Sequence, residues 1–264
     1  MVNDGLNNHE VIENIKLPEK MIDDSKLQAS GKVVESAPPS KVPHVNVVIC
    51  TPGHSLMGIY VKCLLKTIEE LGRRGISWAF SNEFSSHVGD AREITLNGDT
   101  QNDIAEVRPF KGRFTYDKLM WIDSDIAWEP EDFIKLYEAK EDIVSGAYLL
   151  ATGEVTAYPE RLKPGYVYEQ VLEMSELTEV QAIGFGFVCV KQGVFESLTR
   201  PWFQSTEVVW TDPDTDKKFP FMMMGEDMSW CERVMEKGYK IWFDPTVRVT
   251  HHKMMKLTWE GPKP

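Results

Sequence analysis

The sequence has few of the features that mark a secreted or membrane-spanning protein. It contains only four cysteines in 264 residues, and none stand in a paired spacing such as Cys-x-x-Cys. We therefore expect buried free thiols rather than disulfides or a zinc site. No apolar run approaches the roughly 18 to 20 residues that a membrane-spanning helix needs. The N-terminus has neither a basic start nor an apolar core, so we expect no signal peptide and a cytoplasmic protein.

The sequence also has fewer basic than acidic residues. Lysine and arginine together number 29 against 41 acidic residues, which gives a net charge of −12. That is the wrong sign for a protein that grips nucleic acid through broad phosphate contacts. A small anionic ligand held through a metal ion remains compatible with it.

Composition predicts one main globular domain with a distinct N-terminal segment. The 42% of apolar and 27% of charged residues are ordinary for a soluble domain. Residues 1–43 are polar and end in a proline-rich run, Pro38-Pro39-Ser40-Lys41-Val42-Pro43. Such spacing favours a disordered or extended tail, which we interpret as a linker or docking arm. Residues 44–264 form the predicted domain.

Past Pro43 the pattern alternates between strand and helix. Apolar strands are predicted at 45–50, 76–80, 116–122 and 143–148, with helices at 56–71 (ending at Gly72), at 85–96 and from Pro130. After residue 150 we expect a strand at 182–190, a helix at 228–237 and short strands at 240–243 and 246–250. This order predicts an open, three-layer α/β sheet with a mixed second half. Ligands of such sheets bind beyond the carboxyl ends of the strands.

Acidic residues stand at one of those strand ends. The apolar run Leu119-Met120-Trp121-Ile122 finishes in Asp123 and Asp125, with one residue between them. Two acids at the mouth of a buried strand are costly unless something positive lies there. Magnesium or manganese is the natural candidate, because both prefer carboxylate oxygens. Further acids and a histidine pair follow at Gly225-Glu226-Asp227 and His251-His252. Together they suggest a metal-dependent enzyme with a phosphorylated substrate.

These motifs, in this order, resemble those of a known enzyme family. The segment Trp121-Ile122-Asp123-Ser124-Asp125 is similar to the Asp-x-Asp motif of GT-A-fold, nucleotide-sugar-dependent glycosyltransferases. The strand around Gly184-Phe185-Gly186, the turn Gly225-Glu226-Asp227 and the ending Val247-Arg248-Val249-Thr250-His251 follow as they do in that family. The resemblance covers roughly residues 44–259. It implies a single Rossmann-like GT-A domain that uses Mn²⁺ or Mg²⁺ to move a sugar from a nucleotide-diphosphate sugar to an acceptor hydroxyl. Some relatives of this kind are virus-encoded, and such a protein would work in the host cytoplasm.

The resemblance also implies roles for individual residues. Asp123, Asp125 and His251 would hold the metal, and strand alternation favours His251 over His252. Asp227 would be the general base of an inverting transfer, and Glu226 would bind acceptor or sugar hydroxyls. The donor would be bound by Thr51, Pro52, Gly53, Arg92, Asp123, Ser124, Gly184 and Gly186. Trp202, Phe203, Trp210 and Met222-Met223-Met224 are candidates for an apolar wall beside the acceptor or sugar.

The acceptor stays open at this point. A saccharide, a lipid-linked sugar, a protein and a modified DNA base all fit the family, and the N-terminal tail is a candidate for docking a partner.

Each motif also has a purely structural interpretation. Acids after a strand can cap the next helix, and Ser229-Trp230-Cys231-Glu232 is itself a capping-box pattern that would make Glu226 and Asp227 ordinary first-turn residues. His251 and Arg92 can be structural, and the two glycines can simply relieve crowding in a bent strand.

Two rival functions follow. One is a non-catalytic GT-A-like binding or assembly module. The other is a phosphotransferase of the haloacid dehalogenase type, which also places Asp-x-Asp at a strand end.

Overall fold

A computed structural model describes residues 42–98, 105–161, 163–212, 215–253, 256–258 and 261–263. Residues 1–41 of the predicted tail lie outside them, and the residues from His44 onward form one compact unit. Its elements run, in chain order, β1 His44–Pro52, α1 Gly58–Arg74, β2 Trp78–Glu83, α2 Val88–Thr95, the short 3₁₀ helix η1 Pro109–Gly112, β3 Thr115–Ile122, β4 Ile126–Ala127, α3 Pro130–Glu138, β5 Ile143–Ala147, β6 Ala157–Tyr158, α4 Tyr168–Glu173, β7 Thr178–Val180, β8 Ala182–Ile183, β9 Phe187–Lys191, η2 Phe195–Ser197, β10 Glu207–Thr211, β11 Lys218–Met223, α5 Glu226–Glu236, β12 Ile241–Arg248, β13 Thr250–His251, β14 Lys256–Thr258 and β15 Gly261–Lys263.

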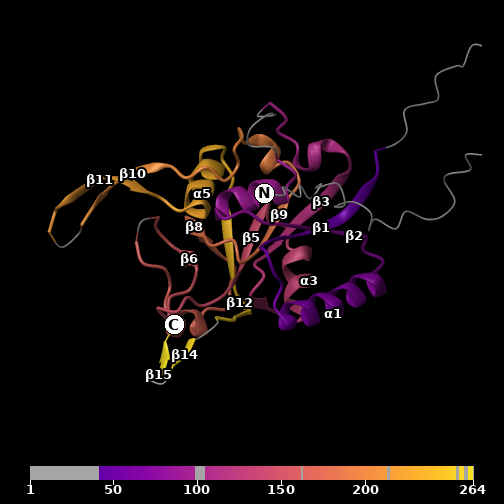
Figure 1. Ribbon diagram of the computed structural model, residues 1–264, viewed down its shortest axis with the longest axis horizontal. Helices are drawn as coiled ribbons and strands as arrows, with labels where there is room; N and C mark the ends of the chain where they lie inside the picture. The colour runs from indigo at the N-terminus through magenta and orange to yellow at the C-terminus, as the bar shows by residue number, and fades with distance from the viewer. Residues whose placement is uncertain are drawn as a thin grey trace, which may run out of the picture. The chain divides into compact units, whose positions relative to one another are not determined.

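The main sheet has seven strands in the order β2-β1-β3-β9-β5-β12-β7 (Figure 1). The strands β2, β1 and β3 are mutually parallel, as are β5 and β12, whereas β9 and β7 run antiparallel to their neighbours. The predicted open mixed sheet flanked by helices is therefore confirmed. Because β1, β2, β3, β5 and β12 point the same way, their carboxyl ends share one edge of the sheet, which is where ligands of such sheets bind.

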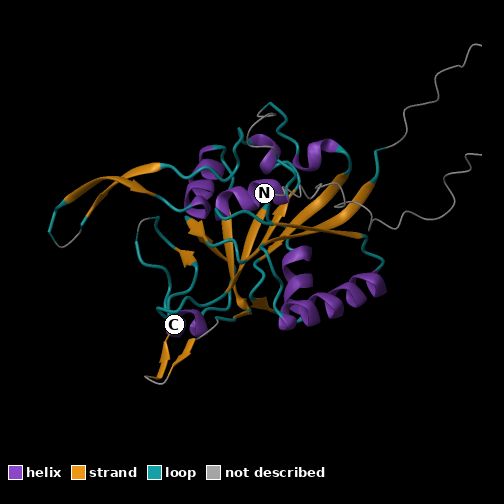
Figure 2. Ribbon diagram, viewed as in Figure 1, coloured by secondary structure: helices purple, strands orange, loops and turns teal. Residues whose placement is uncertain are grey.

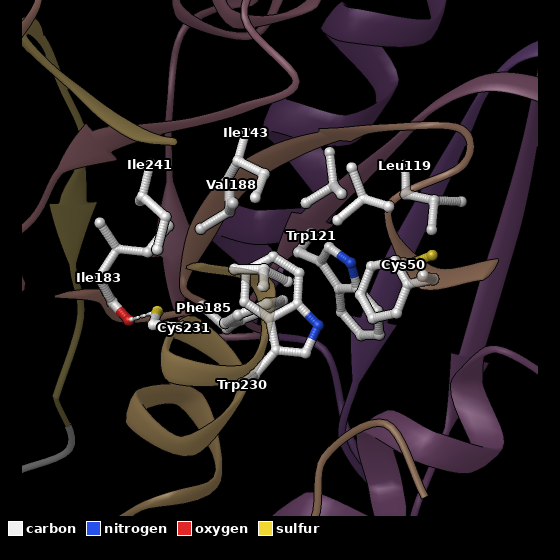
Figure 3. Packing of buried hydrophobic residues seen from close by; sticks show 14 of the residues in the cluster. Cys50, Leu119, Trp121, Ile143, Ile183, Phe185, Val188, Trp230, Cys231 and Ile241 are labelled. Carbon is white, nitrogen blue, oxygen red and sulfur yellow. Dashed lines mark hydrogen bonds between the residues drawn. The ribbon is translucent and has the colours of Figure 1, made fainter. Parts of the chain in front are cut away.

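Alternate residues of the central strands pack into two hydrophobic cores, one on each face of the sheet. In β1 and β3, Val48, Cys50, Leu119 and Trp121 pack on the face covered by α5, together with Trp230. Figure 3 shows this cluster from close by. The intervening residues of the same strands pack on the opposite face against α1 and α3. The helices in Figure 2 accordingly lie on both sides of the strands.

Two absences expected from the sequence can be checked. All four cysteines are buried and free, as predicted. Among the described residues, no helix is long and apolar enough to cross a bilayer.

Three predicted boundaries are wrong, each for a local reason. Helix α1 passes Gly72 and ends at Arg74, because Gly75 supplies the left-handed C-cap (φ 68°). The predicted strand 182–190 is interrupted: β8 pairs with β6, and β9 pairs with β3 and β5. The two short strands predicted at 240–250 are mostly one strand, β12, whose pairing with β5 shifts register between Asp244 and Arg248.

Helix α2 is fixed to the body of the protein by a buried ion pair. Glu93 accepts hydrogen bonds from the Arg200 Nε (2.7 Å) and from the backbone N–H of Trp202 (2.7 Å). Both side chains of the ion pair are almost fully buried, at 1% and 2% exposed. Burying two charges is costly, and the geometry has to offset that cost. The pair therefore holds α2 and the 200–203 segment at one relative position.

We expect Glu93→Gln to destabilise the fold by roughly 3 to 5 kcal/mol, because it removes the carboxylate charge that is paired with the buried Arg200 guanidinium. The matched control is Glu179→Gln, which removes an exposed ion pair with Lys240 and should cost about 0 to 1 kcal/mol. Urea unfolding followed by circular dichroism measures both. A loss below 1 kcal/mol for Glu93→Gln would show that the buried pair does not hold this part of the fold.

Candidate active site

A cleft of about 480 Å³ opens at the carboxyl-end edge of the sheet. It is lined by residues at or just after the ends of β1, β2, β3, β5, β8 and β13, by helix α2, by β6 and the residues before it, and by the first turn of α5. The lining comprises Pro52, Gly53, Phe84, Ser85, Ser86, Val88, Ala91, Arg92, Asp123, Ser124, Asp125, Tyr148, Leu150, Thr156, Tyr158, Gly184, Asp227, His251 and Lys253. Segments up to about 200 residues apart in the chain thus meet at one edge of the sheet.

The loop after β1 is held from the neighbouring strand. The Asn82 Nδ2 donates to the backbone oxygens of Thr51 (2.6 Å) and Gly53 (3.0 Å). The Thr51 side chain bonds to Tyr60 and is buried, so Pro52 and Gly53 face the cleft and Thr51 does not. A Cβ on Gly53 would come 3.0 Å from the Ser124 Oγ. Glycine therefore lets the β1 and β3 loops approach each other closely.

Asp123 begins the β3 loop and faces a buried arginine. Its backbone N–H donates to Gly186 O (3.0 Å), which extends the β3–β9 pairing by one step. The Arg92 guanidinium lies 3.6 Å from the Asp123 Oδ1 and also pairs with Glu226. The Arg92 side chain is only 5% exposed. The structural interpretation of Arg92 as a member of an ion pair therefore agrees with the geometry. Both of its partners, Asp123 and Glu226, are predicted site residues.

Asp125 is bound by two cationic side chains that arrive from β13 and the residues after it. The His251 Nε2 lies 3.2 Å from the Asp125 Oδ2, and the Lys253 Nζ lies 2.9 Å from the same oxygen. Burial alone would raise the pKa of Asp125, but the hydrogen bonds from His251 and Lys253 lower it to about 2. His252 is directed elsewhere: its backbone N–H donates to the Asp125 carbonyl, and its side chain does not line the cleft.

The two ring nitrogens of His251 both face hydrogen-bond acceptors. The Nδ1 lies 3.0 Å from the Leu149 carbonyl oxygen, which can only accept, so Nδ1 carries a hydrogen. The Nε2 then faces an ionised carboxylate that also only accepts. This geometry needs positive charge at Nε2, and hydrogen bonding to Asp125 raises the pKa of His251 accordingly.

The same geometry fits a divalent cation. A metal-binding histidine typically donates its other ring N–H to a carbonyl or carboxylate, as His251 does to Leu149. Among the described residues, no three His, Cys, Asp or Glu side chains converge closely enough to hold a metal ion by themselves. Asp125 and His251 would be the direct protein ligands, while Asp123 is engaged by Arg92. Four carboxyl groups lie in or beside the cleft, and the side chains of Arg92 and Lys253 supply two positive charges. With the acids ionised, a divalent cation would balance the remaining negative charge.

Asp227 lines the same cleft from the first turn of α5, whose N-cap is Gly225. Ser229 is therefore inside the helix and accepts a hydrogen bond from Thr206 N (3.0 Å), so the capping-box interpretation at Ser229 is wrong. The Asp227 Oδ1 accepts the Met228 N–H at 2.7 Å. Burial raises the pKa of Asp227, and the nearby Arg92 charge opposes that rise only in part. A carboxylate with a raised pKa is suited to taking up a proton.

Gly184 and Gly186 make room for one tyrosine. A Cβ on Gly184 would lie 2.2 Å from the Tyr148 hydroxyl oxygen, and one on Gly186 would lie 2.6 Å from the Tyr148 Cζ. The Tyr148 hydroxyl accepts the Gly186 N–H at 3.0 Å. Both glycines were predicted to bind the donor, and the structure gives them a second, steric role, which is to leave space for the Tyr148 side chain. Of the two, Gly184 lines the cleft.

Sequence reasoning did not name ten of the residues that line this cleft, among them Tyr148, Thr156 and Lys253. Of these, only Lys253 had a usable signal, since it follows His251 by two residues and could share its face of an extended chain. The proposed apolar wall is wrong for Trp202 and Phe203, which belong to the core.

The comparisons with known proteins give fold-level likenesses only. No protein-family model matches the sequence, and no curated protein matches it either. Solved structures with a similar fold include A197 from STIV, at 19% identity and a TM-score of 0.48, over 82% of this chain and 91% of that one. GalNAc-T7 with UDP, GalNAc and Mn²⁺ is 12% identical with a TM-score of 0.48, over 80% of this chain but only 44% of its own.

The catalytic domain of Drosophila β1,4-galactosyltransferase 7 with xylobiose is 11% identical with a TM-score of 0.43, over 81% of this chain and 72% of that one. Because all these scores lie below 0.5, we base the proposed function on this chain's own side chains.

The contact between Gly184 and Tyr148 makes a testable steric prediction. Gly184→Ala should destabilise the fold by about 1 to 3 kcal/mol, since the new methyl overlaps the Tyr148 hydroxyl. Adding Tyr148→Phe removes that oxygen and should recover part of the loss, although Tyr148→Phe alone costs about 1 kcal/mol through its bond to Gly186. Thermal unfolding of the three variants measures the coupling. Gly58→Ala, where a Cβ meets nothing within 4 Å, is the control, and simple additivity of the two losses would contradict the prediction.

Proposed function

We propose that this protein is a metal-dependent glycosyltransferase that moves a sugar from a nucleotide-diphosphate sugar to an acceptor hydroxyl with inversion. The observation that carries the proposal is the single cleft lined by Asp123, Asp125, His251 and Asp227. The cleft contains a carboxylate and a histidine whose geometry fits a divalent cation. It also contains an acid with a raised pKa. A transferase of this type needs both functions beside the reacting sugar.

At the metal end, Asp125 and His251 would bind Mn²⁺ or Mg²⁺ directly, and Asp123 would contribute through water or bind the ribose. A divalent cation there would offset the negative charge that develops on the departing nucleoside diphosphate. Lys253, 2.9 Å from the Asp125 Oδ2, carries a second positive charge on a long, half-exposed side chain. We assign it to the same diphosphate, because it can leave Asp125 when a cation takes its place.

In the same cleft, Asp227 would accept the proton of the acceptor hydroxyl as that hydroxyl attacks the sugar. Desolvation supports the role, since it raises the pKa of the carboxyl toward the working range of a general base. Glu226 is engaged by Arg92, so in this proposal its effect is to hold Arg92 and the start of α5 in position. Binding of sugar hydroxyls by Glu226 would require that ion pair to open.

The nucleoside would lie against the β1 and β2 ends of the cleft. The loop from Pro52 to Gly53 and Ser124 give a surface close to the backbone, and Phe84 offers a half-exposed aromatic face. The Phe84 ring meets the His54 ring edge-on, with centroids 4.9 Å apart. A planar base can stack on such a ring.

The first test is release of nucleoside diphosphate from a panel of nucleotide sugars, with Mn²⁺, with Mg²⁺ and with chelator. We expect metal-dependent hydrolysis of one donor, lowered by more than roughly 100-fold in Asp125→Asn, because the variant loses a direct ligand. Asp142→Asn, which alters an exposed ion pair with Lys191, should retain wild-type turnover.

Other outcomes would favour a rival. Binding of metal and nucleotide without turnover, even with acceptor mixtures, would support the non-catalytic module. Transfer of a phosphoryl group to Asp123 would support the phosphotransferase.

The role of Asp227 predicts a pH profile. Because burial raises its pKa, activity should fall as the pH drops through that raised value and the base becomes protonated. Asp227→Asn should lower kcat by roughly 10²- to 10⁴-fold and abolish the acidic limb of the profile.

Folding stability should move in the opposite direction. The folded state binds this proton more tightly than the unfolded state, so the stabilising contribution is present at low pH and is lost as pH rises through the folded pKa. Asp227→Asn should therefore gain stability relative to wild type as pH rises, as urea unfolding at several pH values would show. A variant with full activity and an unchanged acidic limb would exclude Asp227 as the base.

A further inference from the structure

Two polar atoms that line the cleft are buried and have no hydrogen-bond partner within the described part of the chain. They are the Thr156 Oγ1 and the Arg92 Nε, and both residues are 4% exposed. The indole nitrogens of Trp121 and Trp230 are also unpaired, but they lie in the core cluster of Figure 3. An unpaired buried polar group is costly. At a cleft, a bound ligand is what can offset that cost.

Thr156 is held in place by its backbone. Its N–H donates to the Tyr148 carbonyl (3.3 Å), and its own carbonyl accepts the Gly184 N–H (2.9 Å). A Cβ on Gly184 would lie 3.1 Å from the Thr156 Cβ and 2.2 Å from the Tyr148 hydroxyl oxygen, so the three residues meet at one point. Burial raises the pKa of Tyr148 and the neighbouring Thr156 hydroxyl opposes that rise, yet the two hydroxyls do not reach full hydrogen-bonding geometry. The backbone thus fixes the position of the Thr156 hydroxyl, and within the described residues no partner completes a hydrogen bond to it.

The groups around Thr156 define a ligand chemistry. Tyr158 lies two residues further along the extended chain and lines the same cleft with a half-buried ring. Asp227 adds a carboxylate, which accepts hydrogen bonds and repels a phosphate. A hydroxyl that both donates and accepts, a carboxylate acceptor and an aromatic face together suit a neutral ring that bears several hydroxyl groups.

We propose that Thr156, with Tyr158 and Asp227, forms a subsite for a sugar ring, in which the Thr156 Oγ1 hydrogen-bonds a sugar hydroxyl. The proposal rests on the proposed function in that it identifies which part of the cleft takes the sugar. The ring belongs either to the donor or to a saccharide acceptor, and the two sources share the same recognition chemistry.

The test compares Thr156→Val, which keeps the shape and removes the hydroxyl, with Thr156→Ser, which keeps the hydroxyl. Without ligand, Thr156→Val should unfold at the same urea concentration as wild type or a higher one, because it removes an unpaired buried group. Nucleoside diphosphates with Mn²⁺ should bind both variants as they bind wild type in calorimetric titrations. Sugar binding should weaken roughly 3- to 10-fold in Thr156→Val, the range for one net hydrogen bond, and recover in Thr156→Ser.

Two arms separate the sources of the sugar. A loss confined to nucleotide sugars assigns the subsite to the donor, and a loss confined to methyl glycosides, titrated with nucleoside diphosphate and Mn²⁺ present, assigns it to the acceptor. The proposal is overturned if Thr156→Val binds both ligand types like wild type, or if wild type binds no sugar in either arm. A marked loss of stability in Thr156→Val would also overturn it, since the hydroxyl would then have a partner in the fold.

Failure of the proposed function would give a different result from failure of the sugar subsite. If the proposed function is wrong, wild type binds no nucleoside diphosphate in the presence of metal. Titration with methyl glycosides alone would still test the role of Thr156.

Discussion

The cleft depends on one buried positive charge, the guanidinium of Arg92. It lies between Asp123 at the end of β3 and Glu226 at the start of α5, and above the rings of Phe185 (5.2 Å) and Phe203 (5.9 Å). A buried charge is tolerated only where partners surround it. The position of Arg92 on α2 therefore constrains three segments at once. The next residue, Glu93, fixes α2 itself through Arg200 and Trp202.

Around that charge, the environment separates four acids into different roles. Asp123 and Glu226 are engaged by Arg92. Asp125 is kept ionised by His251 and Lys253, with its pKa lowered to about 2. Asp227 is the exception, since desolvation outweighs its cationic neighbour and raises its pKa. The proposed reaction needs an ionised carboxylate to bind a cation and another carboxylate to accept a proton. Different surroundings allow aspartate to serve in both roles.

Steric constraints act around Tyr148, another residue that lines the cleft. Tyr148 occupies the space that side chains at Gly184 and Gly186 would fill, and the chain between β8 and β9 bends around its ring. That bend ends the pairing of β8 with β6 and begins the pairing of β9 with β3 and β5. The same packing holds Thr156 beside the cleft with its hydroxyl unpaired. A rigid wall with an open hydrogen-bonding group is prepared for a ligand before one arrives.

Sequence alone predicted the open mixed sheet, the carboxyl-end edge as the place for a site, and Asp123, Asp125, Asp227 and His251 as its residues. These features are local: apolar runs, strand alternation and acids directly after a strand are visible within ten residues. The tertiary structure decided which charges meet, such as Arg92 with Glu226 across 134 positions. It also decided that Gly184 and Gly186 accommodate Tyr148 rather than continue a strand, and that Thr156 and Lys253 line the cleft. Charge pairing, steric fit and desolvation depend on neighbours in space, and a single sequence without that packing does not contain them in any local pattern.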